Sequence, residues 1–237
     1  MSDYKITFQE LQKLSQVEQS DIYLISIKLE NIDDRIKSII NSISDPSWIN
    51  RLDVIDKTSY EVRAKKTIQH LVNNILKKVE DSVSSNLGEI LVSHSAKDVL
   101  QNDYNHNPIQ LAELWHAKIS GNPSFDFHSE SPKGLIVFGE GKYQNSSSSS
   151  PYSNSAKQIC KFIEQQKDLE DLVHIKNFAT TGAVEKVLPE NGGKKAFAIA
   201  FSMNSANYKL IFENALKSRN VKSLLSYPEV YLIGVEI

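Results

Sequence analysis

The sequence is poor in residues on which several classes of protein depend. Cys160 is the only cysteine among 237 residues, which excludes an intrachain disulfide and a cysteine-rich zinc site and predicts a reducing, cytoplasmic location. Glycine is also sparse, with nine residues, and no dinucleotide-binding glycine fingerprint occurs. The stretch Gly139 to Lys142 lacks the spacing and the following Ser or Thr of a phosphate-binding loop.

Long apolar runs and strong charge bias are absent as well. The longest apolar stretches, such as Leu135 to Phe138 and Ala196 to Phe201, are too short to cross a bilayer. The first ten residues lack the basic and apolar segments of a secretory signal. A net charge of −2 argues against a polybasic nucleic-acid binder but allows a local basic groove. With 40% hydrophobic and 24% charged residues, a globular chain is expected.

Apolar periodicity predicts the elements of the first half. Residues 22–29 are rich in β-branched side chains, which favours a strand. Isoleucines at helical spacing follow in 32–43, and Asp45-Pro46 ends that helix. A long helix is predicted over about 59–83, and Asn86 opens another.

The second half alternates between helices and strands. Residues 109–119 fit strand or helix, and the alternation at 115–119 favours a strand at the end. Further strands are predicted at 125–128, 135–142, 196–203 and 230–237, with helices from about Ser155 and over 205–218, and Ser146 to Ser150 as an exposed loop. This order predicts an α/β fold with a mixed sheet, divided into an N-terminal α/β extension (1–83) and a core (84–237).

Three residues of the predicted hairpin carry the chemistry. Glu140 and Lys142 are two apart on one strand and therefore share a face. Asp126 lies on the preceding strand; a loop of residues 131–134 places it opposite Gly139, whereas a bulge or a five-residue loop places it opposite Glu140. In either register two carboxylates and an ammonium group lie close together at the end of the hairpin.

Two such carboxylates repel each other unless a cation lies between them. Mg²⁺ or Mn²⁺ suits this set, because hard divalent cations bind one or two carboxylates together with phosphate and water. Such a metal activates water and neutralises charge on a phosphate, and Lys142 is positioned to orient the water or stabilise the transition state. Gly141 lets the backbone approach the metal closely.

Asp126 followed by Glu140-Gly141-Lys142 at the end of an apolar strand resembles the signature of the PD-(D/E)xK nuclease superfamily. That resemblance implies a restriction-endonuclease-like core of a helix, three strands, a helix and a further strand. It also implies an acidic ligand on the upstream helix, for which Glu89 stands in the corresponding place. A polar residue on the helix after the lysine is implied too, and Gln158 is the candidate.

A closer resemblance is to the HamA family, the nuclease partners of a helicase in Hachiman anti-phage defence systems. The similar segments are Leu87-Gly88-Glu89, Phe125 to His128 and Val137 to Lys142, within about 86–165. The resemblance implies a cytoplasmic, Mg²⁺-dependent deoxyribonuclease that acts on DNA with a helicase subunit. Asp126, Glu140 and Glu89 would hold the metal, and Lys142 would assist the attacking water.

Other interpretations of these residues stay open at this point. Glu89 follows Asn86 by three positions, which also fits a helix capping box. Glu140 and Lys142 also fit an exposed pair, Asp126 a surface position, and Gln158 a solvated helix face. The basic residues of the long helix fit either a solvated face or a phosphate-tracking surface; they are Arg63, Lys65, Lys66, Lys77 and Lys78. The rival functions are a stand-alone restriction endonuclease and a non-catalytic interaction module.

Overall fold

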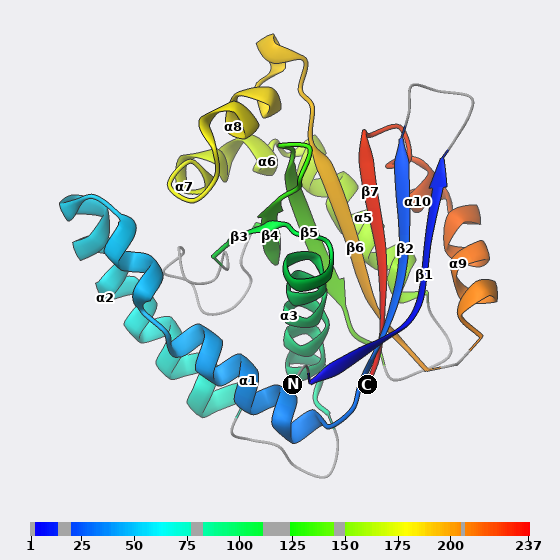
Figure 1. Ribbon diagram of the computed structural model, residues 1–237, viewed down its shortest axis with the longest axis horizontal. Coiled ribbons are helices and arrows are strands. Elements are labelled where there is room, and N and C mark those ends of the chain that lie inside the picture. Colours follow the sequence, from blue (N-terminus) through cyan, green and yellow to red (C-terminus); the bar gives the residue numbers. More distant parts are fainter. Residues whose placement is uncertain (1–2, 14–19, 77–82, 111–123, 145–149, 205–206) are drawn as a thin grey trace.

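The computed structural model describes residues 3–13, 20–76, 83–110, 124–144, 150–204 and 207–237. In these residues one mixed sheet of seven strands has the order β1-β2-β7-β6-β5-β4-β3, with helices packed along it (Figure 1). The strands are β1 (Tyr4–Lys13), β2 (Asp21–Leu29), β3 (Asn107–Ile109), β4 (Phe127–Glu130), β5 (Ile136–Lys142), β6 (Ala196–Met203) and β7 (Glu229–Glu236). The predicted α/β class and mixed sheet are confirmed.

The centre of the sheet is parallel and its two ends are antiparallel. Strands β2, β7, β6 and β5 run in one direction, while β1 pairs antiparallel with β2, and β4 with β5 and β3. Every residue of β6 is buried, and β7 is buried up to Val235. Such continuous apolar strands are typical of a parallel sheet covered on both faces.

Two long helices pack against β5 and position its residues. They are α3 (Ser85–Asp103) and α5 (Pro151–Glu164), and both contact β5 (Figure 1). The other helices of the described chain are α1 (Ile32–Ser44), η1 (Ser47–Arg51), α2 (Val54–His70), η2 (Leu71–Leu76), α6 (Lys167–Glu170), α7 (Leu172–Ile175), α8 (Thr181–Val187), η3 (Pro189–Asn191), α9 (Tyr208–Lys217) and α10 (Arg219–Lys222).

Most predicted elements are found, with shifted ends. The helix that ends at Asp45 and the strands at 22–29, 196–203 and 230–237 are confirmed to within a residue or two. The long helix begins earlier than expected, at Val54, because the Asp53 side chain accepts hydrogen bonds from the first free backbone N–H groups. Residues 115–119 and 146–149 lie outside the described residues.

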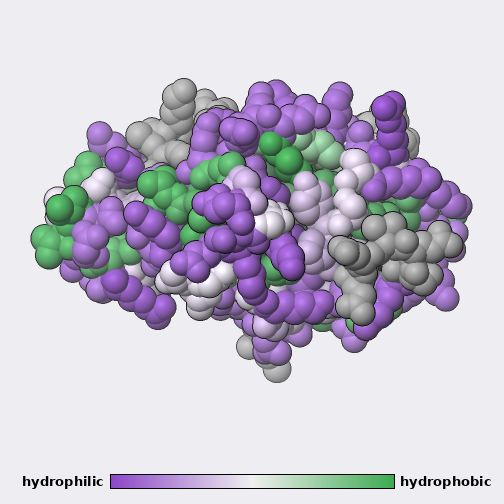
Figure 2. All heavy atoms as spheres, turned by 90° about the horizontal axis from the view of Figure 1, so that it is seen from above, coloured by the Kyte–Doolittle hydropathy of each residue, from purple (hydrophilic) through white to green (hydrophobic). Residues whose placement is uncertain are grey.

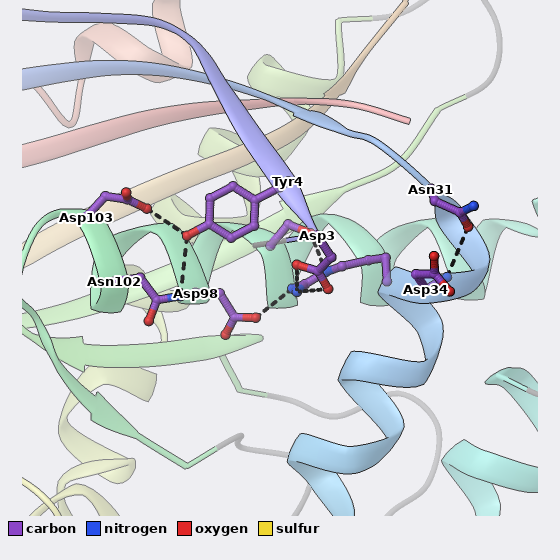
Figure 3. A network of polar contacts seen from close by, with 9 residues as sticks. Asp3, Tyr4, Asn31, Asp34, Asp98, Asn102 and Asp103 are labelled. Atoms are coloured by element: carbon purple, nitrogen blue, oxygen red, sulfur yellow. Dashed lines mark hydrogen bonds and ion pairs between the residues drawn. The ribbon is translucent and has the colours of Figure 1, made fainter. Parts of the chain in front are cut away.

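The N-terminal strands belong to the same sheet as the rest of the chain. Strand β2 lies beside β7, and β1 is joined to α3 by the Tyr4 hydroxyl, which donates to Asp103 at 2.7 Å (Figure 3). The buried Arg35 guanidinium bonds Asp98 at 2.7 Å and Asp3 at 3.1 Å. The division into an N-terminal extension (1–83) and a core (84–237) stays a prediction, while the sheet itself continues across residue 83.

The described surface is mostly polar. Figure 2 shows hydrophobic atoms gathered at the end of the molecule where α2 begins, and there Val54 and Ile55 are each 81% exposed. Among the helices that the structure describes, none combines the length and apolar character needed to span a membrane.

Candidate active site

The register of the β4–β5 hairpin decides where Asp126 lies. Glu130 pairs with Ile136 and Phe127 with Gly139, so five residues, 131–135, connect the strands. The four-residue alternative is therefore wrong: the Ser131 N–H donates to the Leu135 carbonyl at 2.9 Å, and the Gly134 N–H closes the turn by donating to the Ser131 carbonyl at 2.8 Å. The Asp126 N–H also donates to the Gly139 carbonyl at 2.9 Å, so Asp126 lies beside Gly139, just before the paired residues of β4 begin at Phe127.

Two donors hold the Asp126 carboxylate. Its Oδ2 accepts from the Gly141 backbone N–H at 2.8 Å and from the Ser93 hydroxyl at 3.3 Å. Helix α3 comes close enough for this because residue 141 has no side chain: a Cβ at Gly141 would lie 2.2 Å from Ser93 Oγ. The sequence prediction missed Ser93, although its position one helical turn after Glu89 was an available signal.

Lys142 links two further carboxylates. Its Nζ lies 2.8 Å from Glu140 Oε1 and 3.6 Å from Glu89 Oε1. Glu89 is free to face Lys142 because Ser84 caps α3: its hydroxyl accepts from the Leu87 N–H at 3.3 Å. The capping box between Asn86 and Glu89 is therefore wrong. We call Glu89, Asp126, Glu140 and Lys142 the β5 cluster.

Burial sets the electrostatics of the β5 cluster. It raises the pKa of the Glu140 carboxyl well above its usual range; the Asp126 charge raises that pKa further, and Lys142 opposes both. Burial likewise raises the pKa of Asp126 and of Glu89, again against the effect of Lys142. Burial lowers the pKa of Lys142, but the surrounding carboxylates outweigh this and raise it. When all three acids are ionised, the cluster therefore carries more negative charge than the one ammonium group of Lys142 neutralises.

The donor set fits a hard divalent cation. Its ligand atoms are carboxylate oxygens, and Glu140 Oε2 is buried with no hydrogen-bond partner in the part of the chain that the structure describes. The carboxylates are not gathered round a common point: among the described residues, no three Asp, Glu, His or Cys side chains already form a metal-binding group. Lys142 lies where the side chains of Glu89 and Glu140 would have to meet.

The remaining candidates lie apart from the β5 cluster. Gln158 is half-buried on α5 and, among the described contacts, makes no hydrogen bond with any of the four residues. A nearer contribution of α5 is Ser155, which the sequence prediction missed; its hydroxyl donates to the Glu140 carbonyl at 2.7 Å. Lys65 and Lys66 are exposed on α2, whereas Lys77 and Lys78 lie outside the described residues.

Comparisons of the chain with known protein families, curated proteins and solved structures found no match.

Proposed function

We propose that the chain is a metal-dependent nuclease that hydrolyses phosphodiester bonds in DNA, with the catalytic core of the PD-(D/E)xK superfamily. The observation that carries the proposal is the convergence of Asp126, Glu140, Glu89 and Lys142 at the end of β5. The order of α3, β3, β4, β5, α5 and β6 along the chain also agrees with the helix, three strands, helix and strand of that core.

The charge pattern favours catalysis over a purely structural role. Burying a carboxylate is costly unless it is paired, and here the buried Glu140 and the half-buried Glu89 share one lysine, while the charge of the half-buried Asp126 raises the pKa of Glu140 further. Carboxylates whose pKa values are raised in this way are typical of functional sites. A divalent cation at this position removes the excess charge.

Each residue of the cluster has a distinct proposed role. Asp126, Glu140 and Glu89 hold the metal, and the Gly141 and Ser93 donors fix the orientation of Asp126. Bound Mg²⁺ or Mn²⁺ supplies positive charge for the scissile phosphate and lowers the pKa of an attacking water. Lys142 contributes an ammonium group that orients this water or stabilises the negative charge that develops on the phosphate.

The resemblance to the HamA family extends the proposal to partners. DNA is the substrate, a helicase subunit controls access to it, and the pair protects a bacterial cytoplasm against phage. The net charge of −2 supports this arrangement, because a subunit with little affinity of its own for DNA depends on its partner for delivery. Strong, salt-resistant DNA binding by the isolated chain would contradict it.

The decisive experiment is a cleavage assay with matched variants. Supercoiled plasmid is incubated with the chain, alone and with its helicase partner, in Mg²⁺, Mn²⁺ or EDTA. We expect metal-dependent cleavage that falls at least about 10³-fold in Glu140→Gln and Asp126→Asn. Glu229→Gln, which changes another buried glutamate, serves as the control and should cleave normally. Discrete fragments produced by the chain alone would favour the restriction endonuclease.

The non-catalytic alternative has its own outcome. If folded Glu140→Gln and Lys142→Ala variants retain full protection of cells against phage, as measured by plating efficiency, the nuclease proposal fails.

A further inference from the structure

Lys142 lies where a metal ion would bridge the carboxylates. Its Nζ is 2.8 Å from Glu140 Oε1 and 3.6 Å from Glu89 Oε1, and these two acids come from different elements, β5 and α3. A cation between two carboxylates of separate elements is the arrangement expected of a metal, but here the cation is supplied by the chain.

The pairing with Lys142 leaves the cluster incompletely satisfied. One oxygen of Glu140 is paired with Lys142, while Oε2 is buried and has no hydrogen-bond partner among the described residues. The described donors to Asp126 are neutral, namely the Gly141 N–H and the Ser93 hydroxyl. One ammonium therefore offsets part of the charge of the three acids, and a divalent ion offsets more of it.

We propose that Lys142 is a tethered cation that holds the carboxylates of the β5 cluster together before the metal binds, and that the metal binds by displacing its ammonium group. This inference rests on the proposed function and adds a regulatory step to it. Metal binding and release of the Lys142 ammonium are then one event, so the group becomes available to phosphate or water only in the loaded site. The chain without metal holds its lysine in an ion pair.

The proposal predicts that removing the ammonium strengthens metal binding. Without the ammonium group the metal no longer competes with Lys142 for Glu140 and Glu89, and reorganisation of the two carboxylates offsets part of this gain. We therefore expect Lys142→Met to bind Mn²⁺ about 10- to 100-fold more tightly than the wild type while losing cleavage. Lys142→Arg keeps the charge and should bind within about threefold of the wild type.

The test is isothermal titration of Mn²⁺ into the full chain at pH 8.5, where protons compete least for the carboxylates. Lys133→Met is the matched control, because Lys133 also bridges two carboxylates, Asp21 and Glu229, away from the β5 cluster. It should leave Mn²⁺ affinity unchanged. Glu140→Gln identifies the site by weakening the binding. Lys142→Gln repeats the test with a polar side chain, and circular dichroism checks that each variant is folded.

The outcomes separate the two proposals. If Glu140→Gln weakens Mn²⁺ binding but both Lys142→Met and Lys142→Gln bind as the wild type or more weakly, the tethered-cation proposal is overturned and the nuclease proposal stands. If neither the wild type nor the lysine variants bind Mn²⁺ at a site that depends on Glu140, and no cleavage occurs, both proposals fail.

Discussion

Two lysine–carboxylate clusters lie at opposite ends of the parallel strands, and they differ in what they leave unsatisfied. The β5 cluster lies at the end of β5. The other, which we call the β7 cluster, consists of Asp21 and Glu229 at the starts of β2 and β7 and Lys133 in the β4–β5 turn. Lys133 Nζ lies 2.5 Å from Asp21 and 3.4 Å from Glu229, and Glu229 Oε2 is buried with no hydrogen-bond partner within the described ranges.

The comparison shows that a buried, unpaired carboxylate oxygen alone does not identify a metal site. Both clusters have one, on Glu140 and on Glu229. The β7 cluster sets one lysine against two acids, and the Lys133 side chain is 49% exposed, so water solvates part of its charge. The β5 cluster contains a third acid, and its lysine is 20% exposed. The β5 cluster therefore differs from the β7 cluster in its larger number of acids per lysine and in the lower solvent exposure of that lysine.

The largest difference is expected in activity. Lys142→Met should lower metal-dependent cleavage at least about 100-fold, because the ammonium contributes to stabilising charge in the transition state. Lys133→Met should cleave within about twofold of the wild type. Initial rates of plasmid nicking in Mg²⁺ measure both. Equal losses of cleavage in the two variants would contradict a catalytic role that is confined to the β5 cluster.

The next effect is on packing. Gly141→Ala should lower the free energy of unfolding by about 2–3 kcal/mol, because the added Cβ would overlap Ser93 Oγ and push α3 from β5. The matched change is Gly182→Ala in α8, where nothing lies within 4 Å of the added Cβ; it should be neutral or slightly stabilising. Urea unfolding measures both. A Gly141→Ala protein as stable as the wild type would contradict the close approach of α3.

Lowering the pH should change the contributions of His106, which contacts β7, and of Glu140 in the β5 cluster to the free energy of unfolding in opposite directions. His106 bonds Ser129 at 2.9 Å and the Tyr231 hydroxyl on β7 at 3.1 Å, and burial lowers its pKa to about 4. The imidazole of His106 therefore binds a proton more readily in the unfolded state than in the folded state. Its contribution to the free energy of unfolding is fully present above about pH 6.5 and is lost as the pH falls towards 4, with a loss of about 2 kcal/mol at pH 5. Glu140 has the opposite effect: its pKa is raised in the folded state, so its contribution to the free energy of unfolding increases as the pH falls.

Urea unfolding at pH 7 and pH 5 tests the contribution of His106. The His106→Gln variant should lack about 2 kcal/mol of the loss that the wild type shows between these pH values. If the two proteins lose stability equally on acidification, His106 is not the residue responsible.

The central strands could be predicted from the sequence because their apolar runs have one interpretation. Residues 196–203 and 230–237 are nearly continuous apolar segments, and both are central strands. Strand β1 was missed because Tyr4–Lys13 mixes polar and apolar residues, as befits an edge strand with exposed positions. The short helices α6, α7 and α8 were also missed, since elements of four to seven residues carry too few turns for a periodic pattern.

The site could be predicted only in part, because its geometry depends on packing between elements. Glu140 and Lys142 share a strand, so their contact follows from local alternation. The partner of Asp126 depended on one residue of loop length, which the sequence left open. Ser93 and Ser155 reach the cluster from α3 and α5 through tertiary packing. The spacing of Ser93 from Glu89 places both on one face of α3, but the contact of Ser93 with Asp126 depends on how α3 packs against β5.

The smallest predicted effect is the sharpest test of the comparison, because it changes the equivalent residue in each cluster. Glu140→Gln replaces a buried carboxylate whose pKa burial has raised, so at pH 8 the neutral amide relieves a cost of ionisation. We expect it to raise the free energy of unfolding of the metal-free chain by about 1 kcal/mol, as is common when a functional charge is removed. Glu229→Gln removes one of the two partners of Lys133 and should not stabilise the chain. Urea unfolding in EDTA at pH 8 measures both, and stabilisation by Glu229→Gln as large as that by Glu140→Gln would show that the β5 cluster carries no special excess of charge.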